Sequence, residues 1–554
     1  MGAEGDQLTP RWAACLIDRA VANGIEDFCI APGSRSAPLA LAASHRARTS
    51  GDCRLHTHFD ERGLGFLGLG LARGRPGPVA LITTSGTAVS NLHPALTEAR
   101  QSGVPLLALT ADRPVELHDC AANQAIDQNG IFAQQVAWQL NLPEPDERLL
   151  GGWLPQRLDQ ALEHLAGPAQ INVPLREPLY EAPAPTTKLA GHPARQPNPQ
   201  CTCTGPRLPL EPPVLFVAGQ LSVTESQALL AAAESRNIPL LADYGSQLRL
   251  LDHPCVYPAP DALVATPEGR DALTRVGTVV QFGGRLTGRR LTAWLDTEAP
   301  RRWIVSPTGE NLDPCWQART VIGSVASICA ALPPLSQASL QGLSAARQRF
   351  HSARQAILDA DDFAEPQAAA LISESLPAGM TLFAGNSLPI RALDLFASQG
   401  SGNPVLTQRG ASGIDGLIAT AAGYTRTQTA GTTLLIGDLS ALHDLNSLPL
   451  LMHSPHPCVV VALNNDGGGI FGLLPAAEHG PVHDTLFRMP HGFKLEAAAQ
   501  GFGVPYRPCA TPDELKIAYT QACQRSGGSV LEVFCAPHGC RSQMRHLFET
   551  LEAD

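Results

Sequence analysis

Short apolar runs alternate with stretches of helical spacing along the whole chain. Eight runs have the length and composition of buried strands, and they are residues 27–30, 79–83, 106–110, 214–217, 279–282, 434–436, 459–463 and 530–534. Mostly apolar strands separated by helices are typical of parallel sheets that are covered on both faces. The pattern therefore predicts an α/β fold built from repeated βαβ units with right-handed crossovers.

Two stretches interrupt this alternation. Residues 182–213 are dense in Pro, Thr, Gly and Gln and show no periodicity, which is the composition of a domain boundary. Residues 331–365 begin with a Pro-containing break and continue as a polar helix. We therefore predict three doubly wound parallel-sheet domains over residues 1–185, 186–355 and 356–554.

Composition and charge narrow the classes of function. The net charge of -11 makes the chain a poor candidate for nucleic-acid binding, although a local basic site for an anionic substrate remains compatible with it. No apolar stretch reaches about 18 residues, and the first residues lack the regions of a signal peptide, so we expect no membrane span. The 14 cysteines are scattered without a Cys-x-x-Cys pair, so we expect reduced thiols, no zinc site and a cytoplasmic protein.

The strongest chemical signal lies in the predicted third domain. Asp438 and Asn465 each follow an apolar strand, at the edge where open α/β sheets bind ligands. A carboxylate and an amide oxygen suit Mg²⁺, which completes its shell with phosphate and water. The glycines at 467–469 allow the backbone to approach a diphosphate closely. An ordinary turn would explain either motif alone, but the pair resembles the diphosphate motif of thiamine-diphosphate enzymes, with Leu439 in place of the usual glycine.

A second signal lies in the predicted first domain, where HFDER at residues 58–62 precedes a helix rich in Gly and Leu. Thiamine-diphosphate enzymes need a buried Glu that hydrogen-bonds N1′ of the aminopyrimidine and so helps its 4′-nitrogen remove the C2 proton of the thiazolium. Burial should raise the pKa of such a carboxyl group. Asp60 and Glu61 are adjacent, and a pair that only stabilises the helix N-terminus is the alternative. The motif in the third domain favours the cofactor role for Glu61.

Nine blocks of sequence carry a resemblance to one enzyme family. They are residues 31–36 (APGSRS), 57–65 (THFDERGLG), 83–96 (TTSGTAVSNLHPAL), 109–114 (LTADRP), 123–124 (NQ), 385–387 (GNS), 408–416 (QRGASGIDG), 437–448 (GDLSALHDLNSL) and 464–471 (NNDGGGIF). These blocks resemble the 2-succinyl-5-enolpyruvyl-6-hydroxy-3-cyclohexene-1-carboxylate synthases of menaquinone biosynthesis. The resemblance is thin in the middle of the chain and over its last 80 residues.

The resemblance implies an activity and an assembly. It implies thiamine diphosphate with Mg²⁺ or Mn²⁺, decarboxylation of 2-oxoglutarate, and conjugate addition of the succinyl carbanion to isochorismate. It also implies that the cofactor lies between the first domain of one subunit and the last domain of another. The expected assembly is therefore a homodimer or a dimer of dimers.

The resemblance further implies a set of site residues. Because both substrates are dicarboxylates, arginines with their two-pronged guanidinium groups are the suited side chains. The candidate arginines are Arg35, Arg113, Arg289, Arg391 and Arg409, of which Arg289 stands where the family often has Lys. The polar substrate candidates are Ser34, Gln124 and Ser387, and the cofactor and metal candidates are Glu61, Ser387, Asp438, Leu439, Ser440, Asn465 and Gly467. The apolar candidates are Ile414, which would support the bent cofactor, and a wall that would exclude water, formed by Ile470, Phe471 and Leu474.

Alternatives remain open at this stage. The predicted middle domain lacks Gly-x-Gly-x-x-Gly, so we expect no nicotinamide or flavin cofactor there. Another thiamine-diphosphate 2-oxo-acid decarboxylase or an acetohydroxyacid synthase is the alternative within the superfamily. A non-catalytic binding paralogue is the alternative outside it, and intact Glu61, Asp438 and Asn465 argue against it. The sequence assigns no role to His443, Asp444 or Asp466.

Overall fold

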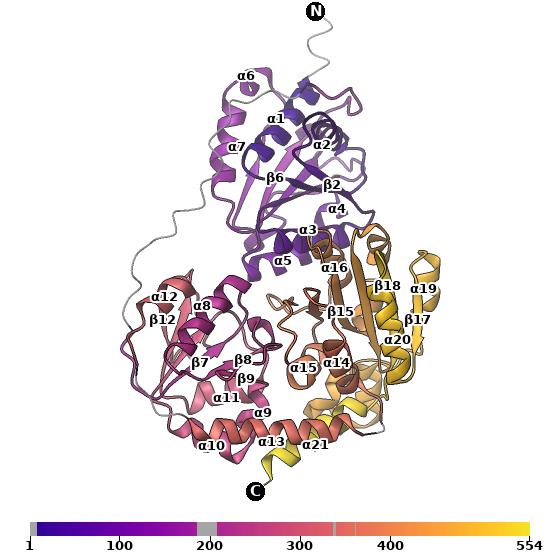
Figure 1. Ribbon diagram of the computed structural model, residues 1–554. Coiled ribbons are helices and arrows are strands. Elements are labelled where there is room, and N and C mark those ends of the chain that lie inside the picture. Colours follow the sequence, from indigo (N-terminus) through magenta and orange to yellow (C-terminus); the bar gives the residue numbers. More distant parts are fainter. Residues whose placement is uncertain (1–7, 186–207, 336–339, 361, 554) are drawn as a thin grey trace, which may run out of the picture.

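The computed structural model describes residues 8–185, 208–335, 340–360 and 362–553. These residues form three six-stranded sheets in which every paired strand is parallel, with helices on the sheet faces (Figure 1). The predicted α/β class with three parallel-sheet domains is confirmed. Much of the predicted first linker lies outside the described residues. Each sheet falls within one predicted domain range, whose boundaries stay a prediction.

The first sheet belongs to the N-terminal domain and has the order β2-β1-β3-β4-β6-β5. Its strands are β1 (Asp27–Ile30), β2 (Arg54–Thr57), β3 (Val79–Thr83), β4 (Leu106–Asp112), β5 (Trp138–Asn141) and β6 (Ala169–Pro174). Its main helices are α1 (Leu8–Ala22), α2 (Ala37–Ser50), α3 (Glu61–Gly74), α5 (His93–Ser102) and α7 (Trp153–Glu163).

The second sheet belongs to the middle domain and has the order β12-β11-β10-β7-β8-β9, which is the strand order of a dinucleotide-binding sheet. Its strands are β7 (Val214–Ala218), β8 (Leu240–Ala242), β9 (Val256–Pro258), β10 (Thr278–Phe282), β11 (Arg301–Ser306) and β12 (Arg319–Ile322). Its helices are α8 (Val223–Glu234), α9 (Pro260–Ala265), α10 (Pro267–Thr274), α11 (Arg289–Thr297) and α12 (Val325–Ala331).

The third sheet belongs to the C-terminal domain and repeats the order of the first, as β14-β13-β15-β16-β18-β17. Its strands are β13 (Thr381–Ala384), β14 (Val405–Thr407), β15 (Thr432–Gly437), β16 (Pro457–Asn464), β17 (Tyr506–Cys509) and β18 (Gly527–Phe534). Its main helices are α14 (Glu365–Glu374), α15 (Leu388–Phe396), α16 (Leu417–Thr425), α17 (Asp438–His443), α20 (Pro512–Cys523) and α21 (Gly539–Glu552).

The N-terminal and C-terminal domains meet where α3 packs against α16 (Figure 1). The two backbones approach so closely that only glycine fits at the contact. A Cβ atom on Gly70 would lie 2.1 Å from the carbonyl oxygen of Thr420, and one on Gly423 would lie 2.1 Å from that of Leu67. One apolar core therefore runs from the first sheet into the third.

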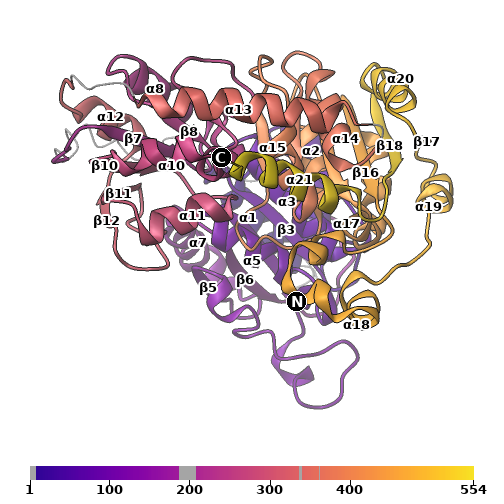
Figure 2. The same cartoon turned by 90° about the horizontal axis from the view of Figure 1, so that it is seen from below.

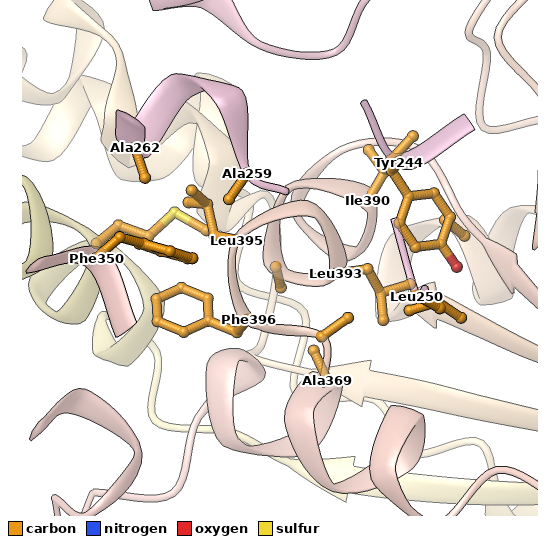
Figure 3. Packing of buried hydrophobic residues seen from close by; sticks show 14 of the residues in the cluster. Tyr244, Leu250, Ala259, Ala262, Phe350, Ala369, Ile390, Leu393, Leu395 and Phe396 are labelled. Atoms are coloured by element: carbon orange, nitrogen blue, oxygen red, sulfur yellow. The ribbon is translucent and has the colours of Figure 1, made fainter. Parts of the chain in front are cut away.

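The middle and C-terminal domains share a second core around α15 (Figure 3). Polar groups on the middle domain bond to the C-terminal backbone beside this core. The Tyr244 hydroxyl donates to the Leu382 carbonyl at 3.0 Å, and Arg249, which is fully buried, donates to the Asp394 carbonyl at 2.6 Å. Helix α21 packs against α9 and α13 (Gln341–Leu358), so the end of the described chain also joins these two domains (Figure 2).

Neither a disulfide nor a membrane-spanning helix occurs in the part of the chain that the structure describes. The described cysteines are all free thiols. Every described helix is either too short or too polar to cross a membrane.

The contact between α3 and α16 gives a first prediction. Replacing Gly423 by Ala should destabilise the protein by about 1–3 kcal/mol, because the new methyl group meets the backbone of Leu67 and one helix must move. Thermal unfolding measures the loss. Gly501→Ala is the matched control, because nothing lies within 4 Å of its added Cβ. Equal melting temperatures for the two variants would contradict the close packing.

Candidate active site

A cavity of about 960 Å³ opens at the carboxyl ends of the strands of the third sheet. Its size is that of a site for sizeable small molecules. Its lining residues lie between Asp261 and Glu552, so they come from the middle and C-terminal domains. It brings together every predicted site residue of these two domains, namely Arg289, Ser387, Arg391, Arg409, Ile414, Asp438, Leu439, Ser440, Asn465, Gly467, Ile470, Phe471 and Leu474.

Asp438 follows the last residue of strand β15, begins α17 and is 3% exposed. Its Oδ2 accepts the Gly467 N–H at 2.8 Å and lies 3.2 Å from Nε2 of His491, while its Oδ1 accepts the Leu439 N–H at 2.7 Å. Burial raises the pKa of Asp438, and these hydrogen bonds lower it. A bound cation would offset the burial of this carboxylate.

Asn465 supplies the observation that tests whether a metal fits here. Its Nδ2 donates to Oε1 of Glu365 at 2.6 Å, whereas its Oδ1 is buried and has no hydrogen-bond partner within the described chain. An unpaired buried acceptor costs about 1–3 kcal/mol, so such an atom calls for an explanation. A neutral oxygen beside the Asp438 carboxylate is the donor set that Mg²⁺ accepts, so the residues fit the expected metal.

Gly467 lies in a backbone conformation that favours glycine, with φ of 129°. A Cβ atom there would also lie 2.3 Å from the carbonyl oxygen of Arg488. The next amide, that of Gly468, donates to the same carbonyl at 2.6 Å. The glycines thus allow a second segment to close over the end of β16 beside Asp438 and Asn465.

Arg391 and Arg409 form a basic part of the cavity wall. Nη1 of Arg391 donates to the Ser387 carbonyl at 2.7 Å, and Nη1 of Arg409 lies 3.3 Å from Oδ1 of Asn386. Burial is the main cause that lowers the pKa of both guanidinium groups, and Arg409 lowers that of Arg391 further. Ser387 has φ of 73°, a strained conformation of the kind that gathers at ligand sites.

Arg289 reaches the cavity from the middle domain. It begins α11, and Asp261 accepts its N–H at 2.9 Å. Asp243, which is buried, accepts the Thr287 N–H at 2.5 Å. These two carboxylates hold the loop before α11 in place, while the Arg289 side chain stays exposed.

The apolar candidates line the same cavity. Ile470 and Phe471 lie in the short helix η6 (Gly469–Leu473), which packs against α21. Leu474 follows this helix and is 43% exposed, so the wall is open to solvent in a single chain. Ile414 lies in the loop between β14 and α16.

The predicted site residues of the N-terminal domain lie elsewhere, and two of them, Arg113 and Gln124, contact Ser85. Arg113 donates to the Ser85 hydroxyl, and Nε2 of Gln124 donates to the Ser85 carbonyl at 3.1 Å. Arg35 is buried and lowers the pKa of Arg113, for which burial is the larger cause. Ser34 is exposed beside it. None of these described side chains lines the large cavity.

Glu61 also lies outside the cavity, at the first position of α3. Its side chain is half-buried rather than fully buried as expected, and no described side chain hydrogen-bonds to its carboxylate. The neighbouring Asp60 takes the capping role, because its Oδ1 accepts the N–H groups of Arg62 at 3.0 Å and Gly63 at 3.4 Å. The structure therefore separates the two adjacent acids and leaves Glu61 available.

Three residues without an assigned role hold the backbone. Asp444 is buried and accepts the N–H groups of Ile418 at 2.7 Å and Ala419 at 3.1 Å, so it caps α16. Asp466 accepts two N–H groups of the loop at 491–492. The His443 carbonyl accepts a hydrogen bond from Arg62 of the N-terminal domain at 2.7 Å.

Several residues that line the cavity or contact its lining residues were not predicted. Glu365 and His491 contact Asn465 and Asp438 and lie outside the motifs of the third domain. Helix α21 contributes a further set of charged side chains, which are Arg541, Arg545, Glu549 and Glu552. An amphipathic C-terminal helix gives no sign of which sheet edge it will cover, so the sequence carried no signal for them.

Comparison with known proteins places the chain in its family. Residues 11–131 match the model of the thiamine pyrophosphate enzyme N-terminal TPP binding domain, and residues 214–384 match the middle domain of thiamine pyrophosphate enzymes. A 2-succinyl-5-enolpyruvyl-6-hydroxy-3-cyclohexene-1-carboxylate synthase of Halorhodospira halophila is 54% identical, over 99% of both chains. The chain belongs to this synthase family. Synthases of the same name from Shewanella amazonensis (39%, over 99% of this chain and 98% of the relative) and Shewanella oneidensis (38%, over 98% and 97%) extend the match.

Family membership decides between the alternatives left open by the sequence. The match to the Halorhodospira halophila synthase covers 99% of the chain, including the segments where the sequence blocks are thin. Membership in the synthase family therefore disfavours a different 2-oxo-acid decarboxylase, an acetohydroxyacid synthase and a non-catalytic paralogue.

The buried cap of α16 gives a second prediction. Burial raises the pKa of Asp444 to about 6, above the usual range of an aspartate. The folded protein thus favours the protonated carboxyl group. This preference contributes fully to the free energy of unfolding below about pH 4, and the contribution is lost as the pH rises through about 6. Relative to Asp444→Asn, wild-type protein should lose about 3 kcal/mol between pH 4 and 7.

Melting temperatures of both proteins at pH 4 and pH 7 measure this effect. The melting temperature of the wild-type protein, relative to that of Asp444→Asn, should be lower at the higher pH. A difference that stays constant would show that the carboxyl group ionises normally in the folded protein.

Proposed function

We propose that this chain decarboxylates 2-oxoglutarate and adds the resulting succinyl unit to isochorismate, giving 2-succinyl-5-enolpyruvyl-6-hydroxy-3-cyclohexene-1-carboxylate and CO2. The main support for this proposal is that Arg289, Arg391 and Arg409 line the same cavity as Asp438 and Asn465. A diphosphate and metal site thus opens into a space with several arginines, which suits substrates with two carboxylates each. We expect the reaction to take place in the cytoplasm.

The cofactor would be held mainly by the C-terminal domain. Asp438, the Asn465 Oδ1 and the Gly467 backbone would bind Mg²⁺ or Mn²⁺, and the start of α17 at Leu439 and Ser440 would lie beside the diphosphate. Bound thiamine diphosphate supplies the electron sink that allows a 2-oxo acid to lose CO2 and act as a nucleophile. Ile414 would support the bent cofactor.

The protein's own residues would then bind, orient and shield the substrates. Arg391 and Arg409 are partly buried, so a bidentate carboxylate contact there is worth more than on the surface. Arg289 lines the cavity but is exposed to solvent, and it would bind a substrate carboxylate that points toward the solvent. Ile470, Phe471 and Leu474 would exclude water from the reacting carbon, which protects a carbanion from protonation.

The complete site requires two chains. Glu61, Ser34, Arg35, Arg113 and Gln124 do not line the cavity of their own chain, although the chemistry needs a carboxylate at the aminopyrimidine. A partner chain in a two-fold dimer would bring this group of residues to the cavity, and its own cavity would receive the equivalent group in return. Glu61 would be fully buried, and would hold the aminopyrimidine proton, only in that dimer.

Hybrid dimers test this arrangement and give a third prediction. Glu61→Gln and Asp438→Ala should each be inactive as homodimers. When the two variants are co-expressed with different affinity tags, a purified hybrid dimer has one doubly defective site and one intact site, so it should recover about half of wild-type activity. Complete inactivity of the purified hybrid would place each site within one chain and overturn the proposal.

Substrate choice gives a fourth prediction. With isochorismate present, 2-oxoglutarate should be used far better than pyruvate, because pyruvate leaves an arginine without its carboxylate. Arg391→Ala should lower kcat/KM for 2-oxoglutarate by an amount that corresponds to about 2–5 kcal/mol. Isochorismate loss and CO2 release measure turnover.

Two controls accompany this experiment. Arg391→Lys keeps the charge and loses the bidentate geometry, so it should fall between wild type and the Ala variant. Thiamine-diphosphate affinity measured by calorimetry should be unchanged in both variants. Equal efficiency with pyruvate and 2-oxoglutarate would reject the proposed donor.

A further inference from the structure

Two adjacent asparagines lie at the end of strand β16, Asn464 as its last residue and Asn465 directly after it, and a different buried glutamate binds each of their amide groups. Nδ2 of Asn464 donates to Oε1 of Glu532 at 2.7 Å, and Nδ2 of Asn465 donates to Oε1 of Glu365 at 2.6 Å. The two glutamates are 0% and 1% exposed. The sequence motif thus depends on two acids that lie about 70 and 100 residues away in the chain.

The two amides differ in their remaining atom. The Asn464 Oδ1 accepts the N–H of Asp466 at 3.0 Å, so both ends of this amide are used. The Asn465 Oδ1 is buried without a hydrogen-bond partner among the described residues, and Asn465 lines the large cavity. Only the second amide therefore presents an unused oxygen at the proposed metal site.

The orientation of the Asn465 amide decides whether it can bind a cation. A carboxamide turned by 180° would present its NH2 group, which repels a cation, in place of its oxygen. A carboxylate accepts hydrogen bonds and does not donate them, so it pairs only with the NH2 edge. Partners of this kind orient metal ligands in many proteins, and their loss typically weakens metal binding by about 10–100-fold.

We propose that Glu365 is a positioning residue, which fixes the Asn465 amide so that its oxygen faces the metal. Glu365 is the first residue of α14, and its short contact with Asn465 ties that helix to the end of β16. Gly469 leaves room for this arrangement, because a Cβ atom there would lie 2.6 Å from Nδ2 of Asn465. The inference rests on the metal site proposed above.

The test, which is the fifth prediction, measures metal binding without turnover. The Mg²⁺ concentration that gives half-maximal thiamine-diphosphate binding is determined by calorimetry on the intact dimer. Glu365→Ala should raise this concentration by about 10–100-fold. Glu365→Gln keeps an acceptor oxygen for the Asn465 NH2 group, so it should stay within a few-fold of wild type.

Two controls separate positioning from general damage. Glu532→Gln alters the clamp on Asn464 and should leave the Mg²⁺ midpoint unchanged, even if it lowers the melting temperature. In an Asn465→Ala background the further change Glu365→Ala should have almost no effect, because the two residues act through one ligand.

Each outcome decides the proposal. An unchanged midpoint in Glu365→Ala overturns it, and so does a clear effect of Glu365→Ala in the Asn465→Ala background, since that result would show that Glu365 acts without the Asn465 ligand. If Asp438→Ala and Asn465→Ala also leave the midpoint unchanged, the metal site itself is wrong and the inference falls with it.

Discussion

The close contact between α3 and α16 is the constraint on which the rest of the molecule depends. It fixes the N-terminal domain against the C-terminal domain backbone to backbone, with no room for a side chain at Gly70 or Gly423. The start of α3 then lies beside the end of α17, where Arg62 bonds to the His443 carbonyl. Glu61 is held at this position, outside the cavity of its own chain. In the proposed dimer, the need for a second chain would therefore follow from a helix contact rather than from the site itself.

The cavity is assembled from charges that the fold has already partly removed from water. Burial lowers the pKa of Arg391 and Arg409 and raises that of Asp438, which means that each group is less stable as an ion than it would be in solvent. Ligands of opposite charge would relieve this cost on both sides, as carboxylates for the arginines and a cation for Asp438. Such a site would favour the ligand-bound state over the empty one.

The sequence predicted the interior of the fold better than its edges. All eight apolar runs are strands, and all eight lie inside a sheet. The edge strands, such as β2 and β17, face solvent on one side and carry polar residues, so no apolar run in the sequence indicated them. The sequence also predicted the motif residues at strand ends, because the carboxyl ends of parallel strands lie at one edge of the sheet. Glu365 and His491 could not be predicted, because their places depend on how distant loops and helices fold back.

The shared strand order of the first and third sheets has a consequence for the history of the chain. Helix α3 follows the second strand of its sheet and α16 follows the second strand of its own, so the contact between them joins equivalent elements. It is reciprocal as well, since Gly70 faces Thr420 while Gly423 faces Leu67. A reciprocal contact between equivalent surfaces is the mark of a two-fold dimer. The N-terminal and C-terminal domains thus have the geometry expected of two copies of one ancestral domain, duplicated and fused in a single polypeptide.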